Sequence, residues 1–373
     1  MSINSFFENY VENKSENSNI SKNIEEKMLK NLLSVPNHPL TIIKNKIIDY
    51  FHDLYKNKSL KVYEPIDPVV SIDDNFDKLL IPKDHPSRSK TDTYYVNDKK
   101  VLATHTSAYQ NMMFSNGYEN FIVVGKVFRK DTVDKSHYPV FHQLEGVFKL
   151  NKEDNPVEGI KKLLSGLVEH LFPNTKYQFN DDYFPFTDPS LEIEVEFNGD
   201  LLEILGCGVV HKQILINNKI SEEDNYVAFG LGLERLAMTL YQIPDIRLFW
   251  TDDPKFLTQF SPNKITKFEP YSLVDPIYRD ISFYINDDVK NGEWNKLNDF
   301  MELCRDNCKD IETVNLFDKF YNKKKQVWSH SFRLIFNPTS EIKDPGEFTS
   351  EVNSTIGKLK DTIQNSNLDL VLR

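Results

Sequence analysis

The sequence predicts an α+β protein with one large domain built on antiparallel strands and a smaller C-terminal module. A central β-hairpin is expected, because two segments rich in β-branched and aromatic residues, 121–129 and 140–149, flank a long polar loop. Two more strands are expected at 191–197, which alternates strictly, and at 201–210, which is apolar. The last hundred residues show the order strand, helix, strand, strand, helix, strand.

The bulk composition is that of a globular protein with a real core. A length of 373 residues predicts two or three domains. The sequence contains no run of 18 apolar residues, so no transmembrane helix is expected. The net charge of −11 argues against indiscriminate nucleic-acid binding but permits a specific complex through a local basic patch. Cys207, Cys304 and Cys308 are too few and too scattered for a disulfide framework or a cysteine zinc site, so a reducing compartment is expected.

Four regions are expected along the chain. Residues 1–30 are rich in Asn, Ser, Glu and Lys with little periodicity, which predicts a mobile tail and a poor mitochondrial presequence. The large domain is expected over 31–255, and it includes helices at 37–54 and 157–171. A linker with two prolines is expected at 256–275, before the C-terminal module at 276–373.

The central hairpin carries the most informative side chains. Its second strand has period two, so Phe141, Gln143 and Glu145 share one face, while His142 and Leu144 lie on the other. An aromatic ring, an amide and a carboxylate in a row, with an arginine ending the paired strand, suit a purine, an ammonium group and a phosphate. The alternative is a solvated hairpin with a surface ion pair.

Two other stretches place polar or aromatic groups on one side. His105 and Ser107 fall on one face of a short strand that turns into a helix, although Ser107 could simply cap that helix. Phe184 and Phe186 are two residues apart, so both rings face the same way, either in the core or as the wall of an aromatic pocket.

Glycines mark the third informative region. Gly206 and Gly208 interrupt a buried strand and would allow another group to approach the backbone closely. Gly230 and Gly232 form a turn between a strand and a helix whose first turn carries Arg235. An arginine there opposes the helix dipole, which is more plausible if a polyphosphate is to be held at the free N–H groups.

The C-terminal order βαββαβ is ferredoxin-like, a fold that hosts many functions. The module is not strongly basic, since residues 271–373 carry 14 Lys and Arg against 17 Asp and Glu. RNA binding there would depend on a local patch such as Arg279, Lys323 to Lys325 and Arg333, together with base stacking.

Six motifs in order along the chain carry a family resemblance. They are DHPSR at 84–88, TSAYQ at 106–110, FRKD at 128–131 with HYPVFHQLEG at 137–146, FPFTDPS at 184–190, LGCG at 205–208 and FGLGLERLAM at 229–238. Together they resemble the class II aminoacyl-tRNA synthetases, and specifically the monomeric, mitochondrial-type phenylalanyl-tRNA synthetases. FRKD with HYPVFHQLEG resembles motif 2 of the class, and FGLGLERLAM resembles motif 3. Tyr109 departs from the histidine of many relatives.

The resemblance implies a catalytic antiparallel sheet followed by a ferredoxin-like anticodon-binding domain, and a role for each matching residue. Residues implied to bind ATP are Arg129, Ser136, His137, Tyr138, Phe141 and Arg235. Residues implied to bind phenylalanine are His105, Ser107, Ala108, Tyr109, Gln110, Gln143, Leu144, Glu145, Phe184, Phe186, Gly206, Ala228 and Gly232. Arg129, Arg235 and Glu145 would carry the chemistry, and Ala228 would set the floor at the para position of the ring.

The implied reaction activates L-phenylalanine with ATP and Mg²⁺, then esterifies tRNA(Phe), with no prosthetic group. Glu203 suits Mg²⁺ by type, but no spacing proves a metal ligand. The implied enzyme is a monomer of the mitochondrial matrix without a membrane partner. The alternatives are a catalytically inactive paralogue that binds RNA, an α subunit that needs a β partner, and an amino-acid ligase that works without tRNA.

Overall fold

The computed structural model describes residues 3–56, 58–262, 264–270, 274–286, 289–290, 292–340, 342 and 344–373. The chain divides into two compact units. The first unit contains residues 1–128, 140–242 and 261–265, and the second contains residues 129–139, 243–260 and 266–373. The loop of the central hairpin therefore groups with the C-terminal part of the chain, a division that no sequence pattern predicted.

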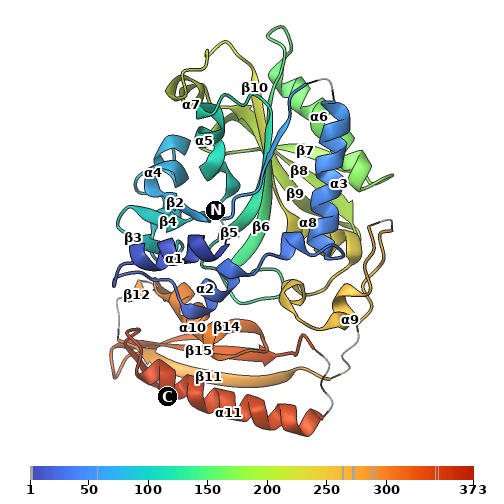
Figure 1. Ribbon diagram of the computed structural model, residues 1–373. Coiled ribbons are helices and arrows are strands. Elements are labelled where there is room, and N and C mark those ends of the chain that lie inside the picture. The colour runs from blue at the N-terminus through green and yellow to red at the C-terminus, as the bar shows by residue number, and fades with distance from the viewer. Residues whose placement is uncertain are drawn as a thin grey trace. The chain divides into compact units, whose positions relative to one another are not determined.

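A seven-stranded sheet forms the centre of the first unit (Figure 1). Its strands run in the order β1 (Lys61–Tyr63), β5 (Phe121–Phe128), β6 (Val140–Lys149), β10 (Tyr226–Gly232), β9 (Asp200–Val210), β8 (Thr187–Phe197) and β7 (Tyr177–Asp182). All neighbours are antiparallel except β1, which is parallel to β5. The predicted hairpin is confirmed as β5 and β6, with register Phe128↔Val140 at its loop end.

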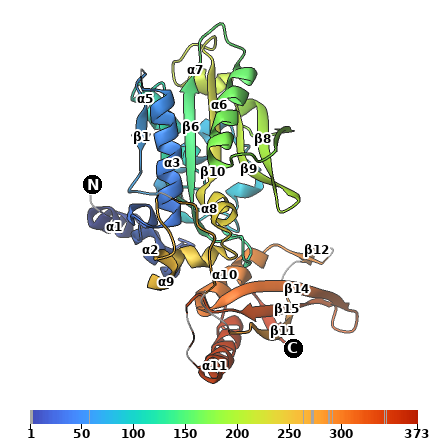
Figure 2. The same cartoon turned by 90° about the vertical axis from the view of Figure 1, so that its right-hand side faces the viewer.

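Three helices cover one face of this sheet: α3 (Pro39–Leu54), α6 (Pro156–Leu171) and α8 (Leu233–Tyr241) (Figures 1 and 2). Helix α3 begins where it was expected, because His38 accepts the N–H of Leu40 and Pro39 occupies the first turn. Phe51 of this helix stacks on Phe148 of β6, with ring centroids 4.8 Å apart. The opposite face, on which Gln143 and Glu145 lie, has a hydrophobic cluster of its own that includes Phe121, Val147 and Ala228.

Short elements flank the opposite face. They are a three-stranded sheet of β2 (Val69–Ser71), β4 (Lys100–Leu102) and β3 (Tyr95–Asn97), with helices α4 (Ile72–Asn75), η4 (Thr106–Tyr109), α5 (Gln110–Ser115) and α7 (Lys212–Asn217). The buried Asn75 fixes the start of η4, because its amide donates to the Thr104 hydroxyl at 2.9 Å and accepts the Thr104 N–H at 3.0 Å.

The structure differs from the expected mobile tail, because residues 3–13 and 22–29 form helices. Helix α1 (Ile3–Asn13) and helix α2 (Lys22–Leu29) bury Phe6, Tyr10 and Met28. Between them, the Asn19 amide donates to the carbonyls of Lys90 and Thr93, both at 2.9 Å. The polar composition misled the prediction because these asparagine and serine side chains bind backbone groups of the folded domain.

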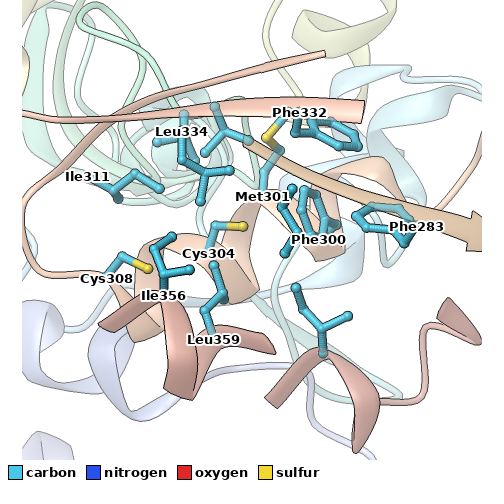
Figure 3. Packing of buried hydrophobic residues seen from close by; sticks show 14 of the residues in the cluster. Phe283, Phe300, Met301, Cys304, Cys308, Ile311, Phe332, Leu334, Ile356 and Leu359 are labelled. Atoms are coloured by element: carbon cyan, nitrogen blue, oxygen red, sulfur yellow. The ribbon is translucent and has the colours of Figure 1, made fainter. Parts of the chain in front are cut away.

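The second unit contains a four-stranded antiparallel sheet in the order β14 (Ile311–Asn322), β15 (Val327–Phe336), β11 (Ile277–Ile285) and β16 (Leu370–Leu372). Two helices, α10 (Leu297–Asn307) and α11 (Pro345–Gln364), share one core with it. Figure 3 shows Phe283 and Phe332 of the sheet near Phe300 of α10. A short hairpin of β12 (Val289–Lys290) and β13 (Glu293–Trp294) follows β11.

The other face of this small sheet is open. Tyr278, Phe317 and Phe320 are each about half exposed on β11 and β14. Lys325 lies 4.3 Å from the ring centroid of Tyr284. Arg279 does not belong to this face, because its guanidinium donates to Asn353 of α11 at 2.6 Å.

The segment 129–139 is held by several contacts within the second unit. Lys130 is buried and forms ion pairs with Asp299 at 2.8 Å and Glu302 at 3.0 Å. Arg305 donates to the carbonyls of Asp131 and Thr132, both at 2.9 Å. The predicted linker at 256–275 begins inside helix α9 (Pro254–Leu257), and its residues 263 and 271–273 lie outside the described residues.

Candidate active site

A row of glycines forms an open floor on the sheet face that the three large helices leave free. Gly230 pairs with Glu145 on one side and with Gly206 on the other, and Gly232 pairs with Gln143. Among the described residues, no atom lies within 4 Å of where a Cβ of Gly230 or Gly232 would stand. The absent side chains therefore leave space directly beside the predicted ligand groups.

Glu145 is the centre of a buried polar cluster at the edge of this floor. Glu145 is 3 % exposed, and its carboxylate accepts hydrogen bonds from the Ser107 hydroxyl and, at 2.7 Å, from the Gln110 amide. The amide oxygens of Gln110 and Gln143 are buried and have no hydrogen-bond partner within the described part of the chain. Two free acceptors beside a carboxylate are the groups that a substrate ammonium would satisfy.

Burial raises the pKa of Glu145 to about 7, against the hydrogen bonds from Ser107, Gln110 and Thr106, which lower it. A carboxyl this close to neutrality gains much from a cationic ligand, because an ammonium group compensates the desolvation of the charged form. Thr106 was not among the predicted site residues, because a threonine hydroxyl in this stretch gave no sequence indication that it would bind Glu145.

The two rings of the predicted aromatic slot stand nearly parallel. The centroids of Phe184 and Phe186 are 5.8 Å apart, with 15° between the ring planes. Phe184 lies over Gly206, where an added Cβ would come within 2.6 Å of the ring. Glu145 is two strands away from Gly206, which corresponds to roughly 10 Å across the sheet. This spacing accommodates an amino acid with its ammonium at one end and its ring at the other.

Other residues implied to form the slot lie near Phe186 or in the hydrophobic cluster against which it packs. His105 lies with its ring centroid 6.2 Å from that of Phe186. Ala108 and Ala228 are buried in the hydrophobic cluster against which Phe186 packs. The register places Ala228 opposite Val147 and Gly208, on the same face as Glu145.

The side chains of two residues that the resemblance implies in phenylalanine binding, Leu144 and Tyr109, lie among other partners in the structure. Leu144 is fully buried and alternates with Gln143 and Glu145, so its side chain points into the core on the other face. The Tyr109 hydroxyl donates to the carbonyl of Asp67 at 3.0 Å and its ring meets Tyr63 edge-on. Both residues support the wall of the site from behind.

Arg235 stands in the first turn of α8 and is half exposed. Its guanidinium donates to the Glu203 carboxylate at 3.1 Å and to the Glu203 carbonyl at 3.2 Å. Glu203 is therefore an ion-pair partner of Arg235 in this structure. No group of three or more His, Cys, Asp or Glu side chains in the described ranges is arranged to hold a metal ion.

A buried pair of side chains, Glu234 and His142, lies on the far side of the floor and was not predicted from the sequence. The Glu234 carboxylate accepts from the His142 backbone N–H at 2.8 Å and lies 2.7 Å from its Nδ1. The only sequence signal was the position of Glu234 next to Arg235 within FGLGLERLAM, and alternation gave His142 no ligand role.

Four predicted ATP-binding residues belong to the segment 129–139 of the second unit. Arg129 and His137 have exposed side chains there. Hydrogen bonds from His137 and Ser136 lower the pKa of Asp134, although burial opposes them. Tyr138 stacks on Trp250, with ring centroids 5.7 Å apart. Phe141 follows on β6 in the first unit and is partly buried.

Comparisons with known proteins show the family of the chain. The model of the family "tRNA synthetases class II core domain (F)" matches residues 23–260. The chain is 43 % identical over 348 residues to a chloroplastic/mitochondrial phenylalanine–tRNA ligase of Arabidopsis thaliana, covering 90 % of this chain and 78 % of that protein. It is 40 % identical over 352 residues to a mitochondrial phenylalanine–tRNA ligase of Mus musculus, covering 83 % and 77 %.

A third relative covers less of the chain. The phenylalanine–tRNA ligase alpha subunit of Prochlorococcus marinus subsp. pastoris is 38 % identical over 228 residues, which is 60 % of this chain and 65 % of that protein. The similarity to the mitochondrial relatives extends over far more of this sequence, so the resemblance to the mitochondrial type is confirmed.

The chain has the core domain of a class II aminoacyl-tRNA synthetase. Within that class, the chain belongs to the phenylalanine–tRNA ligase family. The predicted family, a phenylalanyl-tRNA synthetase of the mitochondrial type, and the predicted enzyme class, a ligase, are thereby confirmed. No helix in the described residues is long and apolar enough to cross a membrane.

The raised pKa of Glu145 predicts a pH-dependent affinity for phenylalanine. Because the ammonium requires the ionised carboxylate, KM for phenylalanine should rise about tenfold per pH unit below 7. Glu145→Gln should weaken binding roughly 10- to 100-fold and remove the pH dependence between 6 and 8. Initial rates of phenylalanine-dependent ATP–pyrophosphate exchange measure both. A wild-type KM that is constant over this range would contradict the assignment.

Stability provides the control for this prediction. The folded pKa of about 7 exceeds the ordinary 4.5, so Glu145 stabilises the fold below pH 4.5 and this contribution is lost as pH rises through 7. Glu145→Gln cannot ionise, so the variant does not lose this stability as the pH rises. The melting temperature of the variant should therefore gain on that of the wild type between pH 5 and pH 8.

Ala228→Gly should admit para-substituted phenylalanines. Removing the buried methyl group leaves space in the hydrophobic cluster against which Phe186 packs, where the floor of the slot is expected. The efficiency of para-chlorophenylalanine-dependent exchange should rise by about tenfold or more relative to that with phenylalanine. An unchanged ratio for the two amino acids would count against the placement of Ala228.

Proposed function

We propose that the chain activates L-phenylalanine with ATP to the adenylate, releases pyrophosphate and transfers the amino acid to the 3′-terminal adenosine of tRNA(Phe) for mitochondrial translation. The observation that carries the proposal is the buried Glu145 beside two unsatisfied amide oxygens, across an open floor from the ring pair Phe184 and Phe186. A cationic group at one end and an aromatic ring at the other describe phenylalanine.

The proposed chemistry is an in-line displacement. The carboxylate of phenylalanine attacks the α-phosphorus of ATP, the P–O bond to the β-phosphate breaks, and pyrophosphate leaves. Arg129 and Arg235 neutralise phosphate charge together with the Mg²⁺ that enters with ATP, and Phe141 stacks on the adenine. Ser136, His137 and Tyr138 border the nucleotide. The 2′-hydroxyl of the terminal adenosine then attacks the carbonyl carbon of the adenylate and displaces AMP.

The C-terminal module is proposed to be a ferredoxin-like domain that binds the anticodon, within a monomeric enzyme. Its strand order β14-β15-β11-β16 with two helices on one face supports this fold. The exposed rings Tyr278, Phe317 and Phe320, with Lys325 over Tyr284, support stacking of unpaired bases. The inactive-paralogue alternative is disfavoured, because the complete ammonium cluster would have no use in an inactive copy.

ATP–pyrophosphate exchange by the purified single chain tests the activation step. Exchange should require phenylalanine and be absent without amino acid, and tyrosine should support a detectable slower rate because an apolar slot rejects an added hydroxyl only about 100-fold. Charging of tRNA(Phe) should follow, and preformed Tyr-tRNA should not be hydrolysed. Folded protein that shows no phenylalanine-dependent exchange would leave the paralogue or the partner-dependent subunit as the better account.

The open sheet face is tested by Phe320→Ala and Lys325→Ala. Each should raise KM for tRNA(Phe) in the charging reaction by roughly 5- to 100-fold, because base stacking contributes about 1–3 kcal/mol per base. Exchange without tRNA should be unaffected. Lys360→Ala, at an exposed position of α11, is the matched control. Equal KM values for all three variants and the wild type would remove this face from the RNA contact.

A further inference from the structure

A carboxylate–histidine pair joins the central strand β6 to helix α8 on the side of the sheet that faces the core. Glu234 is 2 % exposed and His142 is fully buried. One carboxylate oxygen accepts the His142 backbone N–H at 2.8 Å, and the other lies 2.7 Å from His142 Nδ1. Burying a carboxylate is costly unless its oxygens have hydrogen-bonding partners, and here each oxygen lies within hydrogen-bonding distance of a nitrogen of His142.

The register of the sheet explains which donor needs this acceptor. The ladder between β6 and β10 ends at Gln143 and Gly232, because the chain leaves the sheet at Gly232 and starts α8 at Leu233. The next N–H of β6 on that side is that of His142. The Glu234 carboxylate takes the place of the missing strand carbonyl, so the ladder continues by one step through a side chain.

The early end of β10 also creates the space of the site. Gly230 and Gly232 border open space, and the first turn of α8 presents Arg235 beside it. A β10 that continued past Gly232 would satisfy His142 directly, but α8 would then begin further along the chain. Glu234 in that first turn also interacts favourably with the helix dipole, which partly offsets Arg235.

We propose that Glu234 is a positioning residue for the nucleotide, acting through His142. It fixes the start of α8, and thus Arg235, relative to Phe141, the residue before His142. This inference depends on the proposed function, in which Phe141 stacks on adenine and Arg235 binds phosphate. Both ends of the tether thus carry groups that would contact ATP.

The amino-acid half of the site is held independently. Gln143 and Glu145 lie within the region where β6 pairs with β5 on one side and β10 on the other. Ser107 and Gln110 come from η4 and α5, whose entry is fixed by the Asn75–Thr104 pair. Loss of the Glu234 tether should therefore affect ATP and leave phenylalanine binding nearly unchanged.

The test compares ATP and phenylalanine in the exchange reaction of the full chain. Glu234→Gln should raise KM for ATP about tenfold and lower kcat, with KM for phenylalanine within twofold of the wild type. His142→Ala keeps the backbone N–H bond and should raise KM for ATP less. His142→Asn supplies a side-chain N–H in a position similar to Nδ1 and should restore part of the loss.

Asn75→Ala is the matched control, because it removes a buried two-bond clamp that touches neither β6 nor α8. It should leave KM for ATP unchanged. Thermal unfolding of each variant identifies the folded fraction. A purely structural role for Glu234 would lower the active fraction and kcat while both KM values stay at the wild-type level, and that result would overturn the proposal.

Equilibrium binding of Mg·ATP, measured by calorimetry without amino acid, separates this proposal from the proposed function. Weaker ATP binding by Glu234→Gln supports the positioning role even if the wild type shows no phenylalanine-dependent ATP–pyrophosphate exchange. Equal ATP affinities in Glu234→Gln and the wild type would overturn it, even if phenylalanine-dependent exchange is established. If Glu234→Gln does not fold, the difference between His142→Ala and His142→Asn decides the same question.

Discussion

The two-sided character of strand β6 is the constraint on which the rest of this structure depends. Its odd-numbered residues Gln143 and Glu145 face the open floor, and its even-numbered residues His142 and Leu144 face the helices. One strand therefore presents polar groups to the open floor on one side and anchors the fold on the other. Because a shift of register by one residue would exchange the two faces, the pairing with β5 and β10 has to be exact along the strand.

Burial of Glu145 shows how stability is given up at the site. Its pKa of about 7 means that the unliganded fold is less stable at neutral and alkaline pH than it would be with a neutral residue there. The free amide oxygens of Gln110 and Gln143 add to that cost. In the proposed function, the ammonium of phenylalanine would compensate all three groups at once, and this compensation would stabilise the bound state.

Gly230 and Gly232 leave the open floor of the site, and Glu234 compensates for the early end of β10 that this floor requires. An open floor requires that side chains be absent at Gly230 and Gly232 and that β10 end early. An early end leaves a buried N–H at His142, and Glu234 satisfies it. The loop 129–139 is held by helix α10, because Lys130 pairs with Asp299 and Glu302 of that helix and Arg305 of the same helix donates to the Asp131 carbonyl.

The sequence by itself determined the hairpin, its two faces, the six ordered motifs and the strand and helix order of the C-terminal module, because period-two alternation and turn residues are local properties. It did not reveal that residues 3–13 and 22–29 form packed helices, that the Tyr109 hydroxyl binds the Asp67 carbonyl, or that Glu234 binds His142. Each of these depends on partners dozens of residues away, such as Thr93 for Asn19 and Asp67 for Tyr109. Only the tertiary structure decides such pairings, since a polar side chain in a sequence does not specify which distant backbone group it will satisfy.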